Sequence, residues 1–170
     1  PGSAIKPIVY ATALTGTPEN GYLTPASVLW DVPTQYNIDG VVYAPTNFDG
    51  RFRGPVPIRY ALAQSLNIPA IKTYAQFGTQ NFINTSNALG IEFDQTNDDL
   101  TPSFGLPTAL GATEVTLMDL TQAYSIIAND GAYIEPYGVN SITERNTSGV
   151  ESPVELINNP DDNGTVPAEE

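Results

Sequence analysis

The hydrophobic positions recur at helical spacing in several segments, which proline-rich and glycine-rich regions separate. Residues 3–14 carry an apolar helical face, and Gly16 ends this segment. The same spacing predicts further helices over residues 55–67, 70–77, 80–89 and 117–128. Pro69 predicts a break between the second and third helices, and Thr116 is suited to cap the last one.

Few segments are typical of strands. Residues 17–54 contain many prolines and glycines, and only Val28–Asp31 and Val41–Tyr43 predict brief strands within this long loop. One or two short strands are expected in residues 133–143, and a loop from Asn146 onward. The pattern therefore favours a mostly helical α+β fold.

Composition limits the possible chemistry. The 170 residues are 41% hydrophobic, which is enough to bury the core of one domain or of a large piece of one. With no cysteine and no histidine, disulfides, thiolate or histidine metal sites and a Ser-His-Asp triad are all excluded. No cofactor or metal is expected, and any general base must be Lys, Asp, Glu or Tyr.

Charge argues against a nucleic-acid partner, because the formal net charge is −13 with only six basic residues. Arg51, Arg53 and Arg59 form one cluster. This cluster and the loop before it suit a surface that docks a partner, but we prefer pairing of the arginines with the surplus acids. There is no run of about 20 apolar residues that would span a membrane.

The first residues carry a candidate nucleophile. Ser3 and Lys6 lie three positions apart at a predicted helix start, so their side chains share one face. A serine hydroxyl needs a neighbouring base, and a lysine serves as that base when burial lowers its pKa. Taken alone, the pair is more typical of an N-cap serine followed by a solvated lysine, and the rest of the chain must decide.

Three further segments follow in a set order. They are Pro45–Gly50 (Pro-Thr-Asn-Phe-Asp-Gly), Ser65-x-Asn67 with its flanks from Arg59 to Ala70, and the helix that runs through Ala123–Gly131. Together with Ser3-x-x-Lys6, this order resembles the transpeptidase domain of penicillin-binding proteins, with class A enzymes most similar. The resemblance extends over residues 1–150, and residues 151–170 are expected to form an acidic, loop-like continuation.

The resemblance implies a function. Ser3 would attack the D-Ala–D-Ala carbonyl of a peptidoglycan stem peptide, form an acyl-enzyme and pass the acyl group to an amine. Lys6 would accept the Ser3 proton, Ser65 would relay a proton to the leaving group, and Asn67 would bind substrate and orient Lys6. β-Lactam antibiotics would acylate the same serine. The parent protein would be anchored in the bacterial membrane, with this domain on the extracytoplasmic side.

The family's third motif, Lys-Thr/Ser-Gly on an edge strand, does not occur in the sequence. We expect it beyond residue 170, so that this chain is an excised piece that holds the mostly helical part of the β-lactamase/transpeptidase-like fold without most of its antiparallel sheet. The missing strand would supply one oxyanion N–H, and losing one such donor costs about 10²–10³ in rate. The chain alone is therefore expected to have little or no activity.

Two alternatives remain open. A β-lactamase or D,D-carboxypeptidase of the same superfamily would use the same residues with water as the acceptor. A non-catalytic sensor or scaffold would bind β-lactam or a partner without turnover. Ser3, Lys6, Ser65 and Asn67 are all present, which favours an enzyme over a degenerate binding domain.

Overall fold

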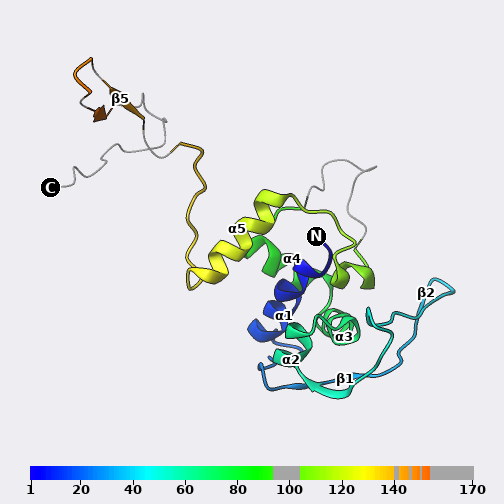
Figure 1. The fold of residues 1–170 in the computed structure, drawn as a ribbon. Helices are drawn as coiled ribbons and strands as arrows, with labels where there is room; N and C mark the ends of the chain where they lie inside the picture. Colours follow the sequence, from blue (N-terminus) through cyan, green and yellow to red (C-terminus); the bar gives the residue numbers. More distant parts are fainter. Residues whose placement is uncertain (94–103, 140–141, 146, 150, 154–170) are drawn as a thin grey trace. The chain divides into compact units, whose positions relative to one another are not determined.

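The computed structural model describes residues 1–93, 104–139, 142–145, 147–149 and 151–153 (Figure 1). The helices are η1 (Gly2–Ile5), α1 (Lys6–Thr15), α2 (Ile58–Ala63), α3 (Asn67–Phe77), α4 (Thr79–Ala88), η2 (Leu106–Leu110) and α5 (Leu117–Ala128), where η marks a 3₁₀ turn. The strands are β1 (Val28–Asp31), β2 (Tyr36–Ile38), β3 (Val41–Tyr43), β4 (Gly54–Pro57), β5 (Thr143–Arg145) and β6 (Glu151–Pro153).

The described strands form three antiparallel pairs, β1 with β4, β2 with β3 and β5 with β6. The contacts divide the chain into two units, Pro1–Ile134 and Glu135–Glu170. The first unit holds all the helices named above, so the mostly helical α+β architecture that the sequence predicts is observed. The boundary expected at residue 150 stays a prediction, and most of residues 151–170 lies outside the described part.

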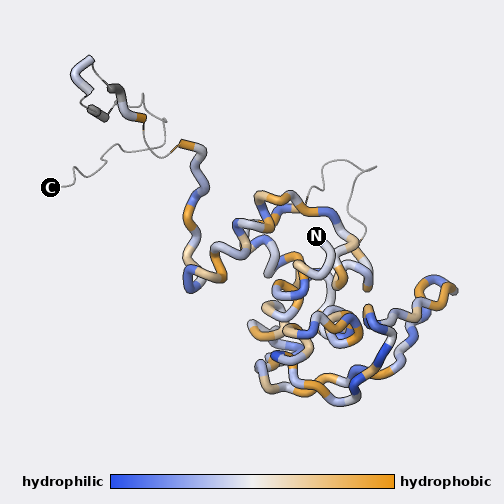
Figure 2. Tube along the Cα trace, viewed as in Figure 1, coloured by the Kyte–Doolittle hydropathy of each residue, from blue (hydrophilic) through white to orange (hydrophobic). Residues whose placement is uncertain are grey.

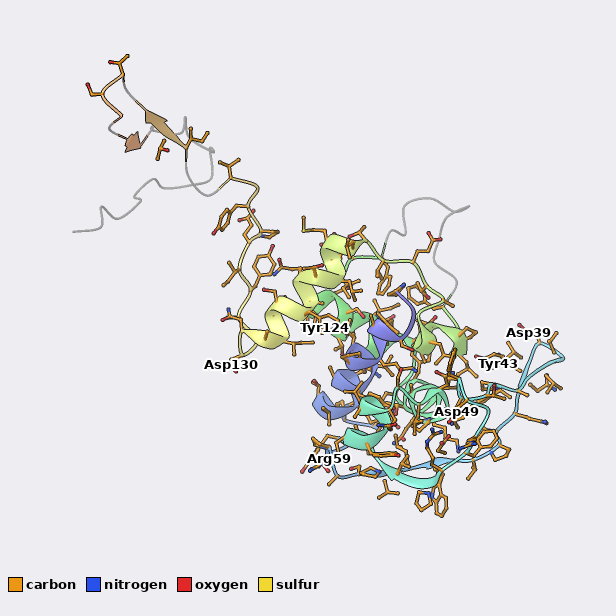
Figure 3. The ribbon with its side chains drawn as sticks, viewed as in Figure 1. Asp39, Tyr43, Asp49, Arg59, Tyr124 and Asp130 are labelled. Atoms are coloured by element: carbon orange, nitrogen blue, oxygen red, sulfur yellow. The ribbon has the colours of Figure 1, made fainter. Side chains whose placement is uncertain are left out.

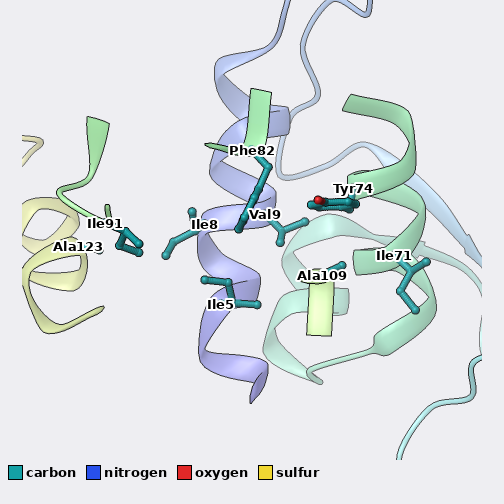
Figure 4. Close-up of a cluster of buried hydrophobic side chains, with 9 residues drawn as sticks. All are labelled: Ile5, Ile8, Val9, Ile71, Tyr74, Phe82, Ile91, Ala109 and Ala123. Atoms are coloured by element: carbon teal, nitrogen blue, oxygen red, sulfur yellow. The ribbon is translucent and has the colours of Figure 1, made fainter. Parts of the chain in front are cut away.

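Helix α1 forms the centre of the first unit. Ile8 and Ala13 are fully buried, and side chains from α3 and α4 close around the helix (Figure 4). Tyr74 of α3 and Phe82 of α4 meet edge to face, with ring centroids 5.4 Å apart. Hydrophobic positions recur along each of these helices (Figure 2). Because α1 is packed on several sides, its first residue, Lys6, is drawn into the interior.

Several predicted elements are confirmed. Strands β1 and β3 have the predicted bounds, and Gly16 ends α1 with φ +78°. The Thr116 hydroxyl accepts a hydrogen bond from Asp119 N at 3.0 Å and so caps α5. The sequence pattern missed β2, which pairs with β3 in a hairpin.

Other predictions were wrong. Residues 55–67 do not form one helix, because β4 occupies Gly54–Pro57 and α2 ends at Ala63. Pro69 does not break a helix but lies in the first turn of α3, where its missing N–H has no intrahelical partner to lose. Residues 133–139 contain no strand; the strand nearby is β5, and β6 interrupts the loop expected from Asn146 onward.

Candidate active site

Ser3 and Lys6 lie on successive elements rather than on one α-helix. Ser3 is in the 3₁₀ turn η1 and exposed, whereas Lys6 opens α1 with its side chain fully buried. The Lys6 N–H donates to the Ser3 carbonyl, which closes the turn. Residues three apart in a 3₁₀ turn are stacked, but Ser3 is exposed and Lys6 is buried, so a common face for their side chains stays a prediction. Within the described residues, however, the Ser3 hydroxyl makes no hydrogen bond to Lys6 or to any other group.

The Lys6 amine contacts two other predicted site residues through three hydrogen bonds. Lys6 Nζ donates to the Ser65 carbonyl oxygen at 2.7 Å, to Ser65 Oγ at 3.2 Å and to Asn67 Oδ1 at 2.7 Å. An ammonium group has three donors, and each has a neutral acceptor. The structure therefore brings Lys6, Ser65 and Asn67 together across about sixty positions of sequence, with Ser3 one turn away.

Burial sets the protonation of Lys6. Desolvation lowers the pKa of Lys6 from 10.5 to about 8, because the buried charge loses hydration. The acceptors around Nζ are a carbonyl, a hydroxyl and an amide, none of which carries a negative charge to offset that loss. At pH 7.5 a pKa of about 8 leaves roughly a quarter of the Lys6 amines neutral, which is the form that accepts a proton.

Ser65 adopts an unusual backbone conformation in the connection between α2 and α3. Its φ is +51°, in the left-handed region that residues other than glycine, asparagine and aspartate seldom enter. In this conformation both its carbonyl and its hydroxyl reach the Lys6 amine. Asn67 begins α3 and does not cap the end of α2.

Two contacts hold the turn that carries Ser3. Gly111 follows η2 with φ +82°, and a Cβ there would lie 2.2 Å from the Gly2 carbonyl oxygen. From α5, the Tyr124 hydroxyl donates to the Ala4 carbonyl at 2.9 Å. Figure 3 labels Tyr124 on this helix. The residues on either side of Ser3 are thus fixed by segments more than 100 positions away in sequence.

The site has a second layer of polar residues with no role assigned from the sequence. Asn47 and Asp31 are both buried, and Asn47 Oδ1 accepts from the Asn67 backbone N–H at 2.8 Å. Asn47 lies in the Pro45–Gly50 segment, which is part of the family resemblance but has no role assigned to any of its residues. A usable signal was present at Asp31, because it alternates with Trp30 along a short strand and thus falls on the buried face beside Leu29.

Among the described residues, no group of three His, Cys, Asp or Glu side chains could hold a metal ion. In that same part of the chain, no helix has the length and hydropathy required to cross a membrane.

Comparisons with known proteins find matches to nearly the whole chain. A family model described as penicillin binding protein transpeptidase domain matches residues 1–166. Penicillin-binding protein 1A of Aquifex aeolicus is 33% identical over 155 residues, covering 91% of this chain and 20% of that protein. The chain thus spans about a fifth of that relative.

Solved structures give the same result. The crystal structure of penicillin-binding protein 1A from Haemophilus influenzae matches with a TM-score of 0.71 and 34% identity, over 88% of this chain and 21% of that one. The structure of penicillin-binding protein A from M. tuberculosis, an imipenem acyl-enzyme complex, matches with a TM-score of 0.67 over 91% of this chain and 38% of that one. At 20% identity, the second match supports the fold alone. The predicted partial transpeptidase fold is confirmed.

Proposed function

Because the chain belongs to the penicillin-binding protein transpeptidase family, we propose that it carries the nucleophile and base of a serine D,D-transpeptidase that cross-links peptidoglycan. The observation that carries the proposal is the buried Lys6 amine, held by Ser65 and Asn67 one turn after Ser3. A lysine that burial keeps partly neutral beside a serine can activate the hydroxyl without a histidine.

The proposed reaction begins at the Ser3 hydroxyl. Ser3 Oγ forms a bond to the carbonyl carbon of the penultimate D-Ala of a stem peptide, and its proton passes to neutral Lys6 Nζ. The tetrahedral intermediate collapses, the peptide bond breaks, and the terminal D-Ala amine leaves with a proton relayed from Lys6 through Ser65 Oγ. An amine of a neighbouring strand then attacks the acyl-enzyme and regenerates the Ser3 hydroxyl.

Each partner of Lys6 has a part in this scheme. The 3.2 Å contact between Lys6 Nζ and Ser65 Oγ is the path for the proton to the leaving group. Asn67 Oδ1 holds the amine in place at 2.7 Å. Ser65 and Asn67 together line the wall of the site that faces the stem peptide.

We further propose that this segment works only with additional sheet structure. The sequence contains no Lys-Thr/Ser-Gly motif, and the described strands form only two-stranded pairs. Such a motif on an edge strand would bind the substrate carboxylate and complete the oxyanion hole. Since one missing oxyanion donor costs about 10²–10³ in rate, the 170-residue chain alone should acylate slowly or not at all.

The proposed partners and location follow from the family. Stem peptides are the substrate and β-lactams are inhibitors that acylate Ser3, in keeping with the imipenem acyl-enzyme of the similar M. tuberculosis protein. The domain would work on the extracytoplasmic side of the bacterial membrane, where peptidoglycan is assembled, in a protein anchored to that membrane.

Labelling with a fluorescent penicillin tests the proposal. The protein at its full natural length should form an adduct that mass spectrometry places on Ser3. Ser3→Ala should abolish the adduct, and Lys6→Met should slow its formation by at least about 10²-fold, the usual range for loss of a general base. Absence of a Ser3 adduct in the folded full-length protein would overturn the proposal. An adduct that hydrolyses within seconds would instead identify a β-lactamase or carboxypeptidase.

The isolated chain provides a separate test of the incomplete site. Efficient labelling of Ser3 in the 170-residue chain would contradict the proposed need for a further strand, while leaving the assignment of Ser3 and Lys6 intact.

A further inference from the structure

A buried carboxylate lies beneath the candidate site. Asp31 is fully buried at the end of β1, where the strand turns Leu29 and Asp31 toward the interior. Its carboxylate accepts from Asn47 Nδ2 at 2.8 and 2.9 Å and from the Arg53 N–H at 3.0 Å. All of these donors are neutral amides.

No cation pairs with this carboxylate within the described part of the chain. The nearby Arg53 guanidinium instead binds the exposed Asp49 at 2.7 Å. Burying an ionised carboxylate without a cation is costly, and an apolar side chain on the same strand would avoid that cost. The hydrogen bonds of Asp31 therefore require an explanation other than the stability of the core.

Asp31 fixes the orientation of one amide. A carboxylate only accepts hydrogen bonds, so the side-chain NH₂ of Asn47 must face it. The same Nδ2 also donates to the Arg51 carbonyl at 2.7 Å. With the NH₂ held on that side, Asn47 Oδ1 faces the Asn67 backbone N–H. It accepts a hydrogen bond from that N–H at 2.8 Å.

The next amide is fixed by the same logic. Asn67 Nδ2 donates to the Thr46 carbonyl at 2.8 Å, which leaves Asn67 Oδ1 to accept from Lys6 Nζ at 2.7 Å. Thr46 and Asn47 are adjacent, so one short loop segment holds both the backbone and the side chain of Asn67. Asp31, Asn47, Asn67 and Lys6 thus form a series of hydrogen bonds in which every group has one permitted orientation.

We propose that Asp31 and Asn47 are positioning residues for the general base: through Asn67 they hold the Lys6 amine in its buried place beside Ser65. The catalytic meaning of this role rests on the function proposed above, but the positioning itself does not. Replacing Asp31 by asparagine sets an NH₂ group against the Asn47 NH₂. Asn47 Nδ2 lies 2.8 and 2.9 Å from the two Asp31 oxygens, so one of these contacts becomes donor against donor, and the hold on Asn47, and through Asn67 on Lys6, is weakened.

Two variants make a matched comparison. Asp31→Asn and Asp49→Asn make the same chemical change eighteen positions apart. Asp49 is exposed and contacts Arg53 and Arg51 but not the series of hydrogen bonds that leads to Lys6. Asn47→Ala breaks the series without altering the charge of Asp31, so it separates positioning from electrostatics and replaces Asp31→Asn if that variant does not fold.

Lysine NMR on the 170-residue chain measures the Lys6 pKa directly and needs no enzymatic activity. Lys6 and Lys72 are the only lysines, so ¹³Cε labelling gives two signals, which Lys72→Arg assigns. Once its support is lost, the Lys6 amine gains water, and its pKa should rise from about 8 by about one unit or more in both Asp31→Asn and Asn47→Ala. Asp49→Asn should leave the Lys6 signal unchanged.

The rate of Ser3 acylation against pH gives the second readout, in the protein at its full natural length. Each unit by which the Lys6 pKa rises lowers its neutral fraction at pH 7 about tenfold. We expect Asp31→Asn to slow acylation at least tenfold at pH 7 and distinctly less at pH 9.5. A purely structural defect would lower the rate by one factor at every pH.

The outcomes separate the two proposals. If Asp31→Asn and Asn47→Ala, when folded, change the Lys6 pKa and the pH profile no more than Asp49→Asn does, the positioning role is wrong. If the Lys6 pKa rises as expected but Ser3 is acylated in neither the unmodified protein nor the variants, positioning is supported and the transpeptidase proposal fails.

Discussion

Gly111→Ala is the most direct test of how the Ser3 turn is held. The new Cβ would lie 2.2 Å from the Gly2 carbonyl oxygen, 2.3 Å from Gly2 N and 2.5 Å from Gly2 Cα. These neighbours are backbone atoms and have no rotamer through which to withdraw. Restoring ordinary van der Waals distance requires a shift of about 1 Å in the backbone next to Ser3.

The expected magnitude has two parts. Alanine at φ +82° costs roughly 1–2 kcal/mol, because its Cβ crowds the following carbonyl in the left-handed region. The clash with Gly2 adds about 1–3 kcal/mol, as for other overpacked sites. If the turn moves instead, a displacement of about 1 Å at the nucleophile slows acylation by about 10²-fold.

Gly131→Ala is the matched control. Gly131 has φ +88°, and nothing lies within 4 Å of a Cβ built there, so this variant carries the conformational cost without the clash. The melting temperature of Gly111→Ala should lie roughly 2–10 °C below that of Gly131→Ala, because only Gly111→Ala carries the clash with Gly2. Fluorescent-penicillin labelling of Ser3 in the full-length protein should be slowed only in Gly111→Ala. Equal melting temperatures and equal labelling rates for the two variants would refute this account of the turn.

Three further predictions concern Lys6, Ser65 and Tyr124. Since the Lys6 pKa is about 8 when folded and 10.5 when unfolded, the unfolded chain binds more protons between these values, and the free energy of unfolding should rise with pH from about 8 upward. The rise has a ceiling of about 3 kcal/mol, and denaturant titrations from pH 7 to 9.5 should show it in the unmodified chain but not in Lys6→Met; equal slopes would contradict it. Ser65→Gly relieves the strain of φ +51°, so its free energy of unfolding should be about 1 kcal/mol higher than that of Ser65→Ala, although both variants lose the hydroxyl. The reverse order would show that the conformation carries no strain. Tyr124→Phe removes the 2.9 Å hydrogen bond to Ala4 and should cost about 0.5–1.5 kcal/mol, whereas Tyr22→Phe, at an exposed site, should cost nearly nothing; an equal loss for both would argue against this anchor.

Much of the local structure could be predicted from the sequence. The helix from Leu117 to Ala128 combines helical spacing with a threonine cap, and both signals lie within one short segment. Gly16 ends α1 because glycine enters the left-handed region without steric cost. Pro69 was misinterpreted because a proline in the first turn of a helix and a proline after a helix give the same local pattern. Only the observation that α3 begins at Asn67 shows that Pro69 lies in the first turn of a helix.

Some features of the candidate site can also be predicted from local sequence, whereas others depend on the tertiary structure. The spacing of Ser3 and Lys6 permits a nucleophile and a base on one side of a helical turn, but only the order of the further motifs favoured these roles over a capping serine and a solvated lysine. The low pKa of Lys6 comes from burial among elements distant in sequence, and the positive φ of Ser65 comes from the connection between α2 and α3. Strand alternation places Asp31 on a buried face, but no local pattern assigns Asp31 or Asn47 a function. The bonds from Asn47 to Asp31, from Asn67 to Asn47 and from Lys6 to Asn67 join residues 16, 20 and 61 positions apart, and such contacts exist only after the chain has folded.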